Sequence, residues 1–359
     1  MAPVARDWTH LMDLNSLLAR ETRTASDLEY LIAPETGSRL EVLAKASADL
    51  TLRRFGRTVT LYAPLYLSNY CVNPCAYCGF SVRQKIARAT LTPAEISSEA
   101  RSLRARGFSH VLLLTGEDRR QASVAYLEAA IALCREHFAH VSIEVYPMTR
   151  DEYVRLVAAG ASAVTLYQET YDRELYARVH PGGPKADYAA RYHAPIEAAA
   201  AGMRGVGLGF LLGLAPWREE IRALYKQAVE VQKASWQTRL AFSFPRLRPA
   251  AGGYEPGHPV SDAELAQMIF SLRLMFPDAE LVLSTRESSR LRDGFLGLGV
   301  TRMSAGSVTT PGGYHEKSAA GEQFAIHDAR GPAEMAAAIA ARGLDPVWKD
   351  WSEAMTEVP

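Results

Sequence analysis

Residues 60–78 carry the sequence Thr-Leu-Tyr-Ala-Pro-Leu-Tyr-Leu-Ser-Asn-Tyr-Cys-Val-Asn-Pro-Cys-Ala-Tyr-Cys, in which an apolar run ends in three closely spaced cysteines. The run Thr60–Leu67 is short and rich in β-forming residues, so it predicts a buried strand. Seven more runs of this kind follow: Val111–Thr115, Val141–Tyr146, Ala163–Gln168, Gly205–Leu211, Leu240–Phe244, Leu281–Ser284 and Val300–Ala305.

Segments with helical periodicity separate most of these runs. They are Pro93–Arg106, Tyr126–Phe138, Arg150–Ala158, Asp187–Ala201, Arg218–Ser235 and Asp262–Phe276. Strands that alternate with helices predict a parallel sheet in an α/β protein. Eight such units predict a closed (β/α)8 barrel of the TIM type, and an open sheet is the alternative.

Helical segments flank the predicted barrel. In residues 1–58, apolar residues recur every three to four positions over Asp27–Ile32 and Leu40–Ala46, which predicts a helical N-terminal extension. We expect the barrel to span residues 59–330. Residues 331–359 are expected to form a C-terminal helix and an ordered tail that packs its aromatic side chains on the barrel.

Charge and composition narrow the class of protein. Lys plus Arg and Asp plus Glu both total 40, so the net charge gives no reason to expect nucleic acid or an anionic membrane as a partner. Hydrophobic residues make up 48% of the chain, enough for a large core. We see no signal peptide and no apolar run long enough to span a bilayer, and therefore expect a cytoplasmic protein.

Three of the four cysteines, Cys71, Cys75 and Cys78, lie within eight positions, whereas Cys134 stands alone in a helical segment and is expected to be buried. Three thiolates on one loop can hold three irons of a cubane and leave the fourth iron open. Structural zinc would need a fourth ligand, and the nearest histidines, His110 and His137, lack ligand spacing. Catalytic zinc held by the three cysteines stays an alternative, and three buried thiols are disfavoured.

Residues suited to binding or catalysis recur where the predicted strands end. They are the cysteine triplet, Gly116 and Glu117, Glu144 and Tyr146, Gln168 and Glu169, Arg246 and Arg248, Arg286 and Glu287, and Ser304 and Ser307. In a parallel barrel all these ends lie on one face, where active sites occur. By contrast, Gly205-Val-Gly207-Leu-Gly209 lies inside a strand pattern, so we expect its glycines to narrow the barrel or pack on a bound adenosine rather than to form a dinucleotide loop.

The spacing Cys71-x3-Cys75-x2-Cys78, with Tyr77 before the last cysteine, resembles the signature of the radical S-adenosylmethionine (SAM) superfamily. The resemblance implies a [4Fe-4S] cluster on the three cysteines whose open iron binds the amino and carboxylate groups of SAM. One electron then cleaves SAM to methionine and a 5′-deoxyadenosyl radical, which abstracts a hydrogen atom.

The same resemblance suggests further contacts to SAM. Gly116 and Glu117 correspond to a pair that contacts the SAM amino group, and Arg178 is expected to pair with the SAM carboxylate. Glu144 and Glu169 interrupt apolar strands, and we expect them to bind the ribose hydroxyls or the substrate amine.

Longer stretches resemble the 2-iminoacetate synthase family, the tyrosine lyases of thiamine biosynthesis. They are Leu61–Cys71, Leu166–Tyr171, Ser243–Pro249, Leu283–Ser288, Pro311–Tyr314 and Gly343–Trp351. The resemblance implies cleavage of the Cα–Cβ bond of L-tyrosine to 2-iminoacetate and p-cresol. It also implies two protein partners: the thiazole synthase of thiamine biosynthesis, and an electron donor of the flavodoxin or ferredoxin type.

A free amino acid substrate needs a cation for its carboxylate. Arg286 is our first choice, with Ser304 and Ser307 as hydroxyl partners, and Arg246 and Arg248 are second choices that could serve SAM or the phenol end. Three alternative functions are open at this point. The tyrosine lyase of hydrogenase maturation has further C-terminal cysteines, and none follows Cys134 here. A tryptophan lyase and a non-catalytic zinc-binding protein are the others.

Overall fold

A computed structural model describes residues 14–348 and contains a closed parallel barrel. Its strands are β1 (Thr58–Ser68), β2 (His110–Thr115), β3 (His140–Glu144), β4 (Ala163–Thr165), β5 (Gly205–Gly209), β6 (Arg239–Ser243), β7 (Glu280–Leu283) and β8 (Arg302–Ser304). Neighbours in the chain are neighbours in the sheet, and β1 pairs with both β2 and β8, so the sheet closes on itself. The predicted (β/α)8 barrel is confirmed, and all eight predicted strands are present.

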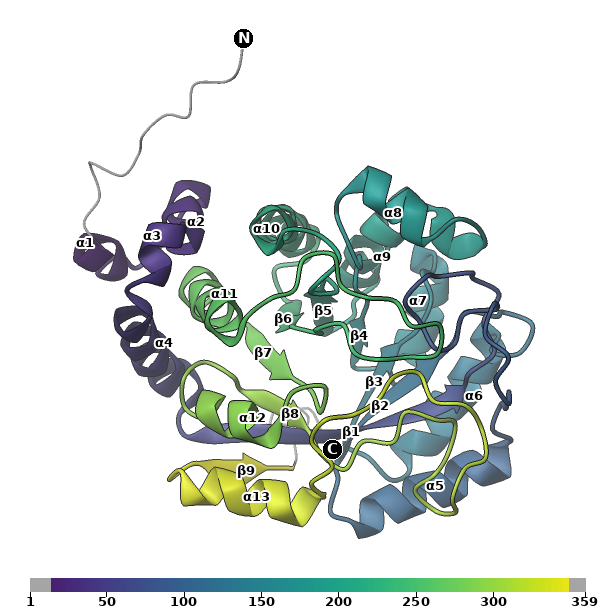
Figure 1. Ribbon diagram of the computed structural model, residues 1–359. Helices are drawn as coiled ribbons and strands as arrows, with labels where there is room; N and C mark the ends of the chain where they lie inside the picture. The colour runs from purple at the N-terminus through teal and green to yellow at the C-terminus, as the bar shows by residue number, and fades with distance from the viewer. Residues whose placement is uncertain (1–13, 349–359) are drawn as a thin grey trace.

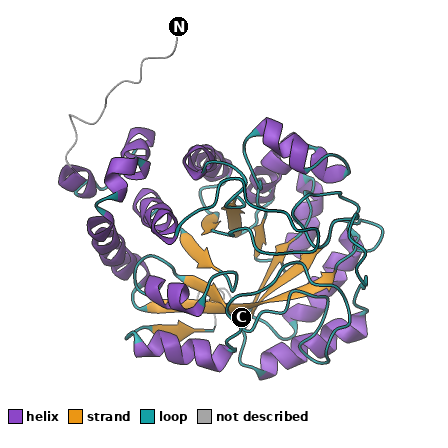
Figure 2. Cartoon of the chain, in the orientation of Figure 1, coloured by secondary structure: helices purple, strands orange, loops and turns teal. Residues whose placement is uncertain are grey.

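Helices surround the barrel on its outside (Figures 1 and 2). The helices that follow the strands are α5 (Pro93–Ala105), α6 (Val124–Arg135), α7 (Arg150–Ala158), α8 (Arg173–Val179), α9 (Tyr188–Ala200), α10 (Trp217–Ala234), α11 (Asp262–Met275) and α12 (Ser289–Phe295). Capping boxes at Thr92, Thr149 and Ser261 fix where α5, α7 and α11 begin, and the predicted starts agree with them. Helices α8 and α12 were not predicted, because seven residues are too few for a clear helical period.

Four helices precede the barrel: α1 (Leu14–Leu18), α2 (Ala25–Ile32), α3 (Pro34–Gly37) and α4 (Leu40–Phe55). Helices α2, α3 and α4 lie beside α11, and the Gln267 amide of α11 donates to the carbonyls of Leu31 and Ala33 at 2.9 and 2.8 Å. After the barrel come α13 (Pro332–Ala341) and a short strand, β9 (Asp345–Val347), which pairs with the start of β1.

The predicted aromatic tail is partly described. The Trp348 ring lies edge-on to Phe108, with ring centroids 5.6 Å apart, and the rest of the predicted tail, residues 349–359, lies outside the described residues. The domain limits at residues 58 and 330 stay predictions. No helix within residues 14–348 is long and apolar enough to cross a membrane.

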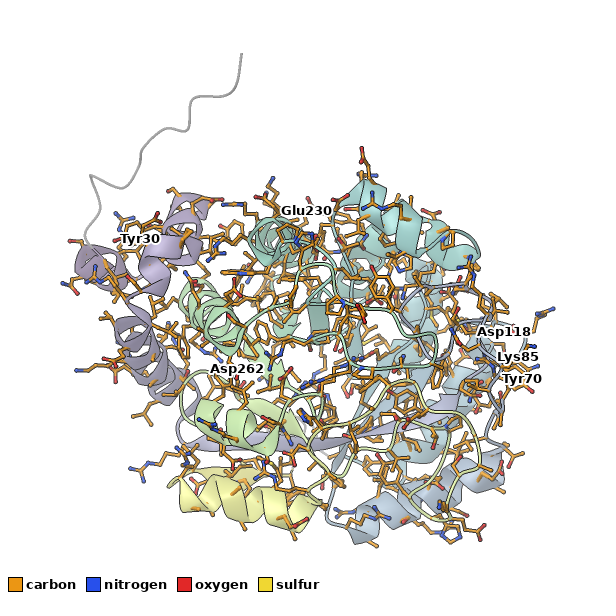
Figure 3. All side chains as sticks on the ribbon, viewed as in Figure 1. Tyr30, Tyr70, Lys85, Asp118, Glu230 and Asp262 are labelled. Atoms are coloured by element: carbon orange, nitrogen blue, oxygen red, sulfur yellow. The ribbon has the colours of Figure 1, made fainter. Side chains whose placement is uncertain are left out.

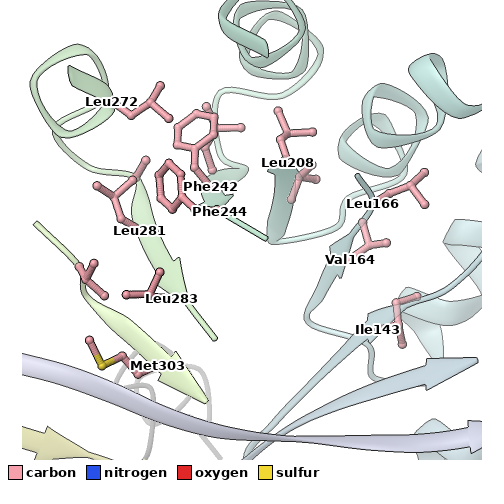
Figure 4. Close-up of a cluster of buried hydrophobic side chains, with 14 of the residues drawn as sticks. Ile143, Val164, Leu166, Leu208, Phe242, Phe244, Leu272, Leu281, Leu283 and Met303 are labelled. Atoms are coloured by element: carbon pink, nitrogen blue, oxygen red, sulfur yellow. The ribbon is translucent and has the colours of Figure 1, made fainter. Parts of the chain in front are cut away.

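Side chains of the strands alternate between two cores. Outward residues such as Leu208, Phe242 and Leu281 pack against the helices (Figure 4). Inward residues such as Tyr62 and Leu112 form a smaller cluster inside the barrel. Because Val206 and Leu208 face outward, the three glycines of β5 face the interior, where they add no side chain.

A buried ion pair ties α12 to the segment after β8. Arg292 and Asp328 have side chains that are 0% and 1% exposed, and Arg292 donates to both the Asp328 carboxylate and the Ser304 carbonyl. Replacing Asp328 with Ala would strand a buried guanidinium, so we expect urea unfolding to show a loss of about 3–5 kcal/mol. Asp293→Ala removes a more exposed partner of the same network and is expected to cost about 1 kcal/mol or less. Equal losses in both variants would contradict the assignment.

Candidate active site

The loop that carries Cys71, Cys75 and Cys78, here called the cysteine loop, follows β1 directly and is held against the end of β2. Val72 N donates to the Glu117 carbonyl at 3.0 Å, and the Asn73 amide donates to the Glu117 carboxylate at 2.7 Å. The same amide lies 3.7 Å from the Cys71 sulfur. Asn73 thus connects a predicted cluster ligand to the predicted SAM contact Glu117. In Figure 3, Tyr70 of this loop and Asp118 of the turn after β2 lie on one side of the molecule, together with Lys85.

Two glycines let other segments approach the loop closely. A Cβ at Gly116 would lie 2.3 Å from the Tyr70 carbonyl oxygen, and one at Gly79 would lie 2.4 Å from the Gln323 carbonyl oxygen. Gly116 is therefore needed for contact between β2 and the loop itself. Gly79 lets the segment after β8 reach the loop, where the Gln323 amide lies 4.0 Å from the Cys78 sulfur.

The donor set fits an iron–sulfur cluster. Cys71, Cys75 and Cys78 are free thiols on one loop, and Cys78 lines a cavity at the mouth of the barrel. Burial raises the pKa of Cys75 to about 12, while the nearby Lys185 ammonium acts in the opposite direction and favours the thiolate. Within residues 14–348, no three His, Cys, Asp or Glu side chains converge on a point where one metal ion would sit. A cubane does not require this, because each thiolate binds a different iron.

Two small adjoining cavities, of about 60 and 70 Å³, occupy the mouth of the barrel. Six residues line both cavities: Glu144, Tyr167, Pro245, Arg286, Gln323 and Phe324. One continues toward Cys78 and Tyr77, and the other toward Ser304 and Ser307. The cysteine loop and the predicted substrate residues therefore open on the same space.

Arg286 is the cation best placed to bind an anionic ligand there. Its guanidinium lies 3.4 Å from the centroid of the Phe324 ring and makes a weak 3.4 Å bond to the Arg246 carbonyl. No carboxylate of the described residues forms an ion pair with it. The Ser307 hydroxyl, which lines the same cavity, is buried without a hydrogen-bond partner. Both groups thus have capacity left for a ligand.

Glu144 ends β3 and lines both cavities. Burial raises the pKa of its carboxyl to about 7, Arg286 opposes that shift, and Glu169 adds to it. Glu144 can therefore hold a proton near neutral pH or, once ionised, accept hydrogen bonds from an ammonium.

The raised pKa of Glu144 predicts a pH-dependent stability. The unfolded carboxyl titrates near 4.3, so the native state is penalised as pH rises from about 4 through 7. Glu144→Gln copies the neutral acid, and we expect it to match the wild type at about pH 4 and exceed its free energy of unfolding by about 3–4 kcal/mol at pH 8. Urea titrations of the protein without cluster test this. A difference that does not change with pH would contradict the expected titration.

Glu169 belongs to a buried charge network beneath the cysteine loop. Its carboxylate accepts from Lys185 at 2.7 Å and from Arg191 at 3.2 Å. Burial acts to raise the pKa of Glu169, but Lys185 and Arg191 outweigh it and lower the pKa to about 2. Glu169 is also the one non-glycine residue within 14–348 with a positive φ, 72°. Two cations already share this carboxylate, so its predicted contact to the ribose or substrate amine stays a prediction.

Two neighbouring side chains, His180 and Lys185, hold the Tyr77 ring in place. Its hydroxyl lies 2.7 Å from His180 Nε2, and Lys185 Nζ lies 5.6 Å from its ring centroid. Burial, assisted by Lys185, lowers the pKa of His180 to about 3, so the imidazole is neutral. With Nδ1 donating to the Tyr176 carbonyl, Nε2 accepts a hydrogen bond from the Tyr77 hydroxyl.

Three arginines that we predicted as ligands are less available than Arg286. Arg178 is exposed on α8 and lines neither cavity. Arg246 forms ion pairs with Glu287 and Asp262 and also lines neither. Arg248 lines the cavity next to Cys78 but shares Glu287 with Arg246. Their roles stay predictions, and Arg286 is better placed than either alternative arginine.

Comparison with known proteins agrees with this geometry. Residues 65–228 match the model of the radical SAM superfamily, and residues 243–345 match the Biotin and Thiamin Synthesis associated domain. The chain is 42% identical over 340 residues to 2-iminoacetate synthase of Escherichia coli strain K12, which covers 94% of this chain and 90% of that protein. The chain belongs to the 2-iminoacetate synthase family.

Solved structures place this 2-iminoacetate synthase family member among similar barrels. HydG, a maturase of the [FeFe]-hydrogenase, superposes with a TM-score of 0.90 at 30% identity, over 95% of this chain and 76% of that one. Methylornithine synthase superposes with a TM-score of 0.73 at 24% identity, over 93% of this chain and 96% of that one, which shows a shared fold.

Sequence reasoning missed several residues that shape this site. Asn73 lies between two predicted ligands, Lys185 and Arg191 follow α8, and Gln323 and Phe324 come from the long segment after β8. Asn73 could have been predicted from the sequence, because it lies between Cys71 and Cys75 in the cysteine motif. The others lie in loops or on a helix, where nothing marks a side chain as facing the barrel mouth.

Proposed function

We propose that this protein cleaves the Cα–Cβ bond of L-tyrosine to give 2-iminoacetate and p-cresol. The observation that carries the proposal is one shared space at the barrel mouth, lined by the cysteine loop on one side and by Arg286, Ser304 and Ser307 on the other. Curated relatives bear the name 2-iminoacetate synthase at up to 42% identity.

Cys71, Cys75 and Cys78 would hold a [4Fe-4S] cluster. When bound, the cluster and SAM supply the one-electron chemistry that begins a hydrogen-atom abstraction. Glu117, held by Asn73, is the proposed partner of the SAM amino group. Lys185 places a positive charge beside the cysteines, and Glu169 and Tyr77 keep it there.

The remaining residues position the substrate. Arg286 would bind the tyrosine carboxylate as a two-donor fork, and the unpartnered Ser307 hydroxyl would bind the same group. Glu144 would accept a hydrogen bond from the amine. Phe324 and Tyr167 line both cavities, and with substrate bound their rings would limit access of water to the reacting carbon atoms.

The proposal extends to the setting of the reaction. We propose a cytoplasmic enzyme that receives electrons from a flavodoxin- or ferredoxin-type donor and supplies its imine to the thiazole synthase of thiamine biosynthesis. The name of the matching domain at residues 243–345 supports the link to thiamine.

Anaerobic reconstitution tests the function. Protein loaded with iron and sulfide and incubated with SAM, dithionite and L-tyrosine should be brown and should form p-cresol and 5′-deoxyadenosine together. Tryptophan in place of tyrosine should yield no aromatic cleavage product. Zinc without colour, or no p-cresol from an intact cluster, would refute the proposal.

A further inference from the structure

A third cavity lies at the opposite end of the barrel from the cysteine loop. Its volume is about 320 Å³, and it shares no lining residue with the two cavities at the mouth. Arg239, Glu280 and Arg302, the first residues of β6, β7 and β8, line it. Since all eight strands are parallel, these starts lie at the end remote from the cysteines.

Small inward residues leave room for this cavity. TIM barrels are normally filled by layers of bulky inward side chains. Here the inward positions of β4, β5 and β6 at this level carry Ala163, Gly205, Gly207 and Ala241, and all four line the cavity. Its volume lies at the lower end of the range of small-molecule sites.

The charge of the lining is unbalanced. Three guanidinium groups, those of Arg204, Arg239 and Arg302, face one carboxylate, that of Glu280. Glu280 pairs with Arg302 at 2.5 Å, and both side chains are largely buried, 20% and 13% exposed. Arg204 and Arg239 have interactions of their own, yet they add two further positive charges to the lining.

Arg302 retains a donor for a ligand. Its Nε is buried and has no hydrogen-bond partner, although one of its terminal nitrogens is paired with Glu280. An unpaired buried donor is costly, and an oxyanion in the cavity would satisfy it. Guanidinium groups bind planar carboxylates with two parallel hydrogen bonds, and the apolar surface of the inward residues Ala163 and Ala241 suits a short carbon chain.

We propose that this cavity is a second ligand site, which binds a small carboxylate of two or three carbons. The carboxylate could be the product of the proposed reaction or an unrelated metabolite, and the chemistry that recognises it is the same. The site does not depend on the cysteine loop. If the arginines served only to close the end of the barrel, no binding would occur.

Isothermal titration of the full-length protein with glycolate, without SAM or tyrosine, tests the site. We expect one saturable site in the wild type and at least roughly tenfold weaker binding in Arg302→Gln, which loses a charged partner. Glu280→Gln removes the only carboxylate of the lining and should bind glycolate several-fold more tightly. Arg155→Gln, which removes an exposed guanidinium paired with Glu128 outside the cavity, should leave binding unchanged.

The changes in glycolate affinity of the two cavity variants decide whether the site exists. Opposite changes in Arg302→Gln and Glu280→Gln support the site even if one variant proves less stable than the wild type. No saturable heat, binding that survives in Arg302→Gln, or tighter binding of inorganic phosphate than of glycolate would each overturn the proposal. Binding of glyoxylate, the hydrolysis product of 2-iminoacetate, at least roughly tenfold more tightly than glycolate would point to the reaction product as the source, and equal binding would point to an unrelated carboxylate. Tyrosine cleavage plays no part in these measurements, so each proposal can fail alone.

Discussion

Replacing Cys75 with Ala is expected to reduce the formation of both 5′-deoxyadenosine and p-cresol to background. Cys75 is the most deeply buried member of the triplet, 4% exposed, and it lies between the other two on the loop. A cubane that lost one of its three protein ligands would have two open corners and would not be retained in its active form. The measurements are iron and sulfide content, the electron spin resonance signal of the reduced protein, and both products under anaerobic conditions.

Cys134→Ala is the matched control. Cys134 lies on α6, is 0% exposed and belongs to the hydrophobic core. Its loss leaves only a small cavity and should cost about 1 kcal/mol of stability, with iron content and both products unchanged. If Cys75→Ala kept its turnover, the assignment of the loop to the cluster would be wrong.

Replacing Arg286 with Ala is expected to lower kcat/KM for tyrosine roughly 10²–10³-fold while slow cleavage of SAM continues. Each hydrogen bond to a charged group contributes about 1.5–3 kcal/mol, and a tenfold change in rate corresponds to about 1.4 kcal/mol. Arg286 makes no ion pair with any carboxylate of residues 14–348. Its removal raises the pKa of Glu144 further, so that this carboxyl stays protonated at neutral pH and leaves no uncompensated charge. Cluster content and stability should therefore stay close to those of the wild type.

Two further variants test whether Arg286 binds the tyrosine carboxylate. Arg286→Lys keeps the charge but not the two-donor fork, so it should recover part of the activity. Arg290→Ala, four positions later at an exposed site on α12, should behave like the wild type. Unchanged tyrosine kinetics in Arg286→Ala would move the carboxylate site to another group, with Arg248 the next candidate.

The order of elements was predictable because each strand and helix has a local period. Eight apolar runs predicted eight strands, and the cap residues Thr92, Thr149 and Ser261 marked where helices begin. The short helices α8 and α12 escaped because they are barely two turns long. Strand β9 escaped because it is three residues long and pairs with a strand almost 290 positions earlier.

The sequence predicted a parallel barrel and the face on which chemistry occurs, and the pairing of β1 with both β2 and β8 confirmed that the barrel is closed. Glu144, Arg286, Ser304 and Ser307 came together at one cavity because the carboxyl ends of parallel strands meet at one rim. That rule needs only the position of each residue along its own strand.

Only the tertiary structure shows which charged side chains form ion pairs with each other and which remain available to bind a ligand. Glu169 is shared by Lys185 and Arg191, and Arg246 is paired with Glu287, whereas Arg286 has no such partner in the described chain. These pairings join loops and helices far apart in the sequence. No local period records them, because whether two charges neutralise each other depends on their separation in space.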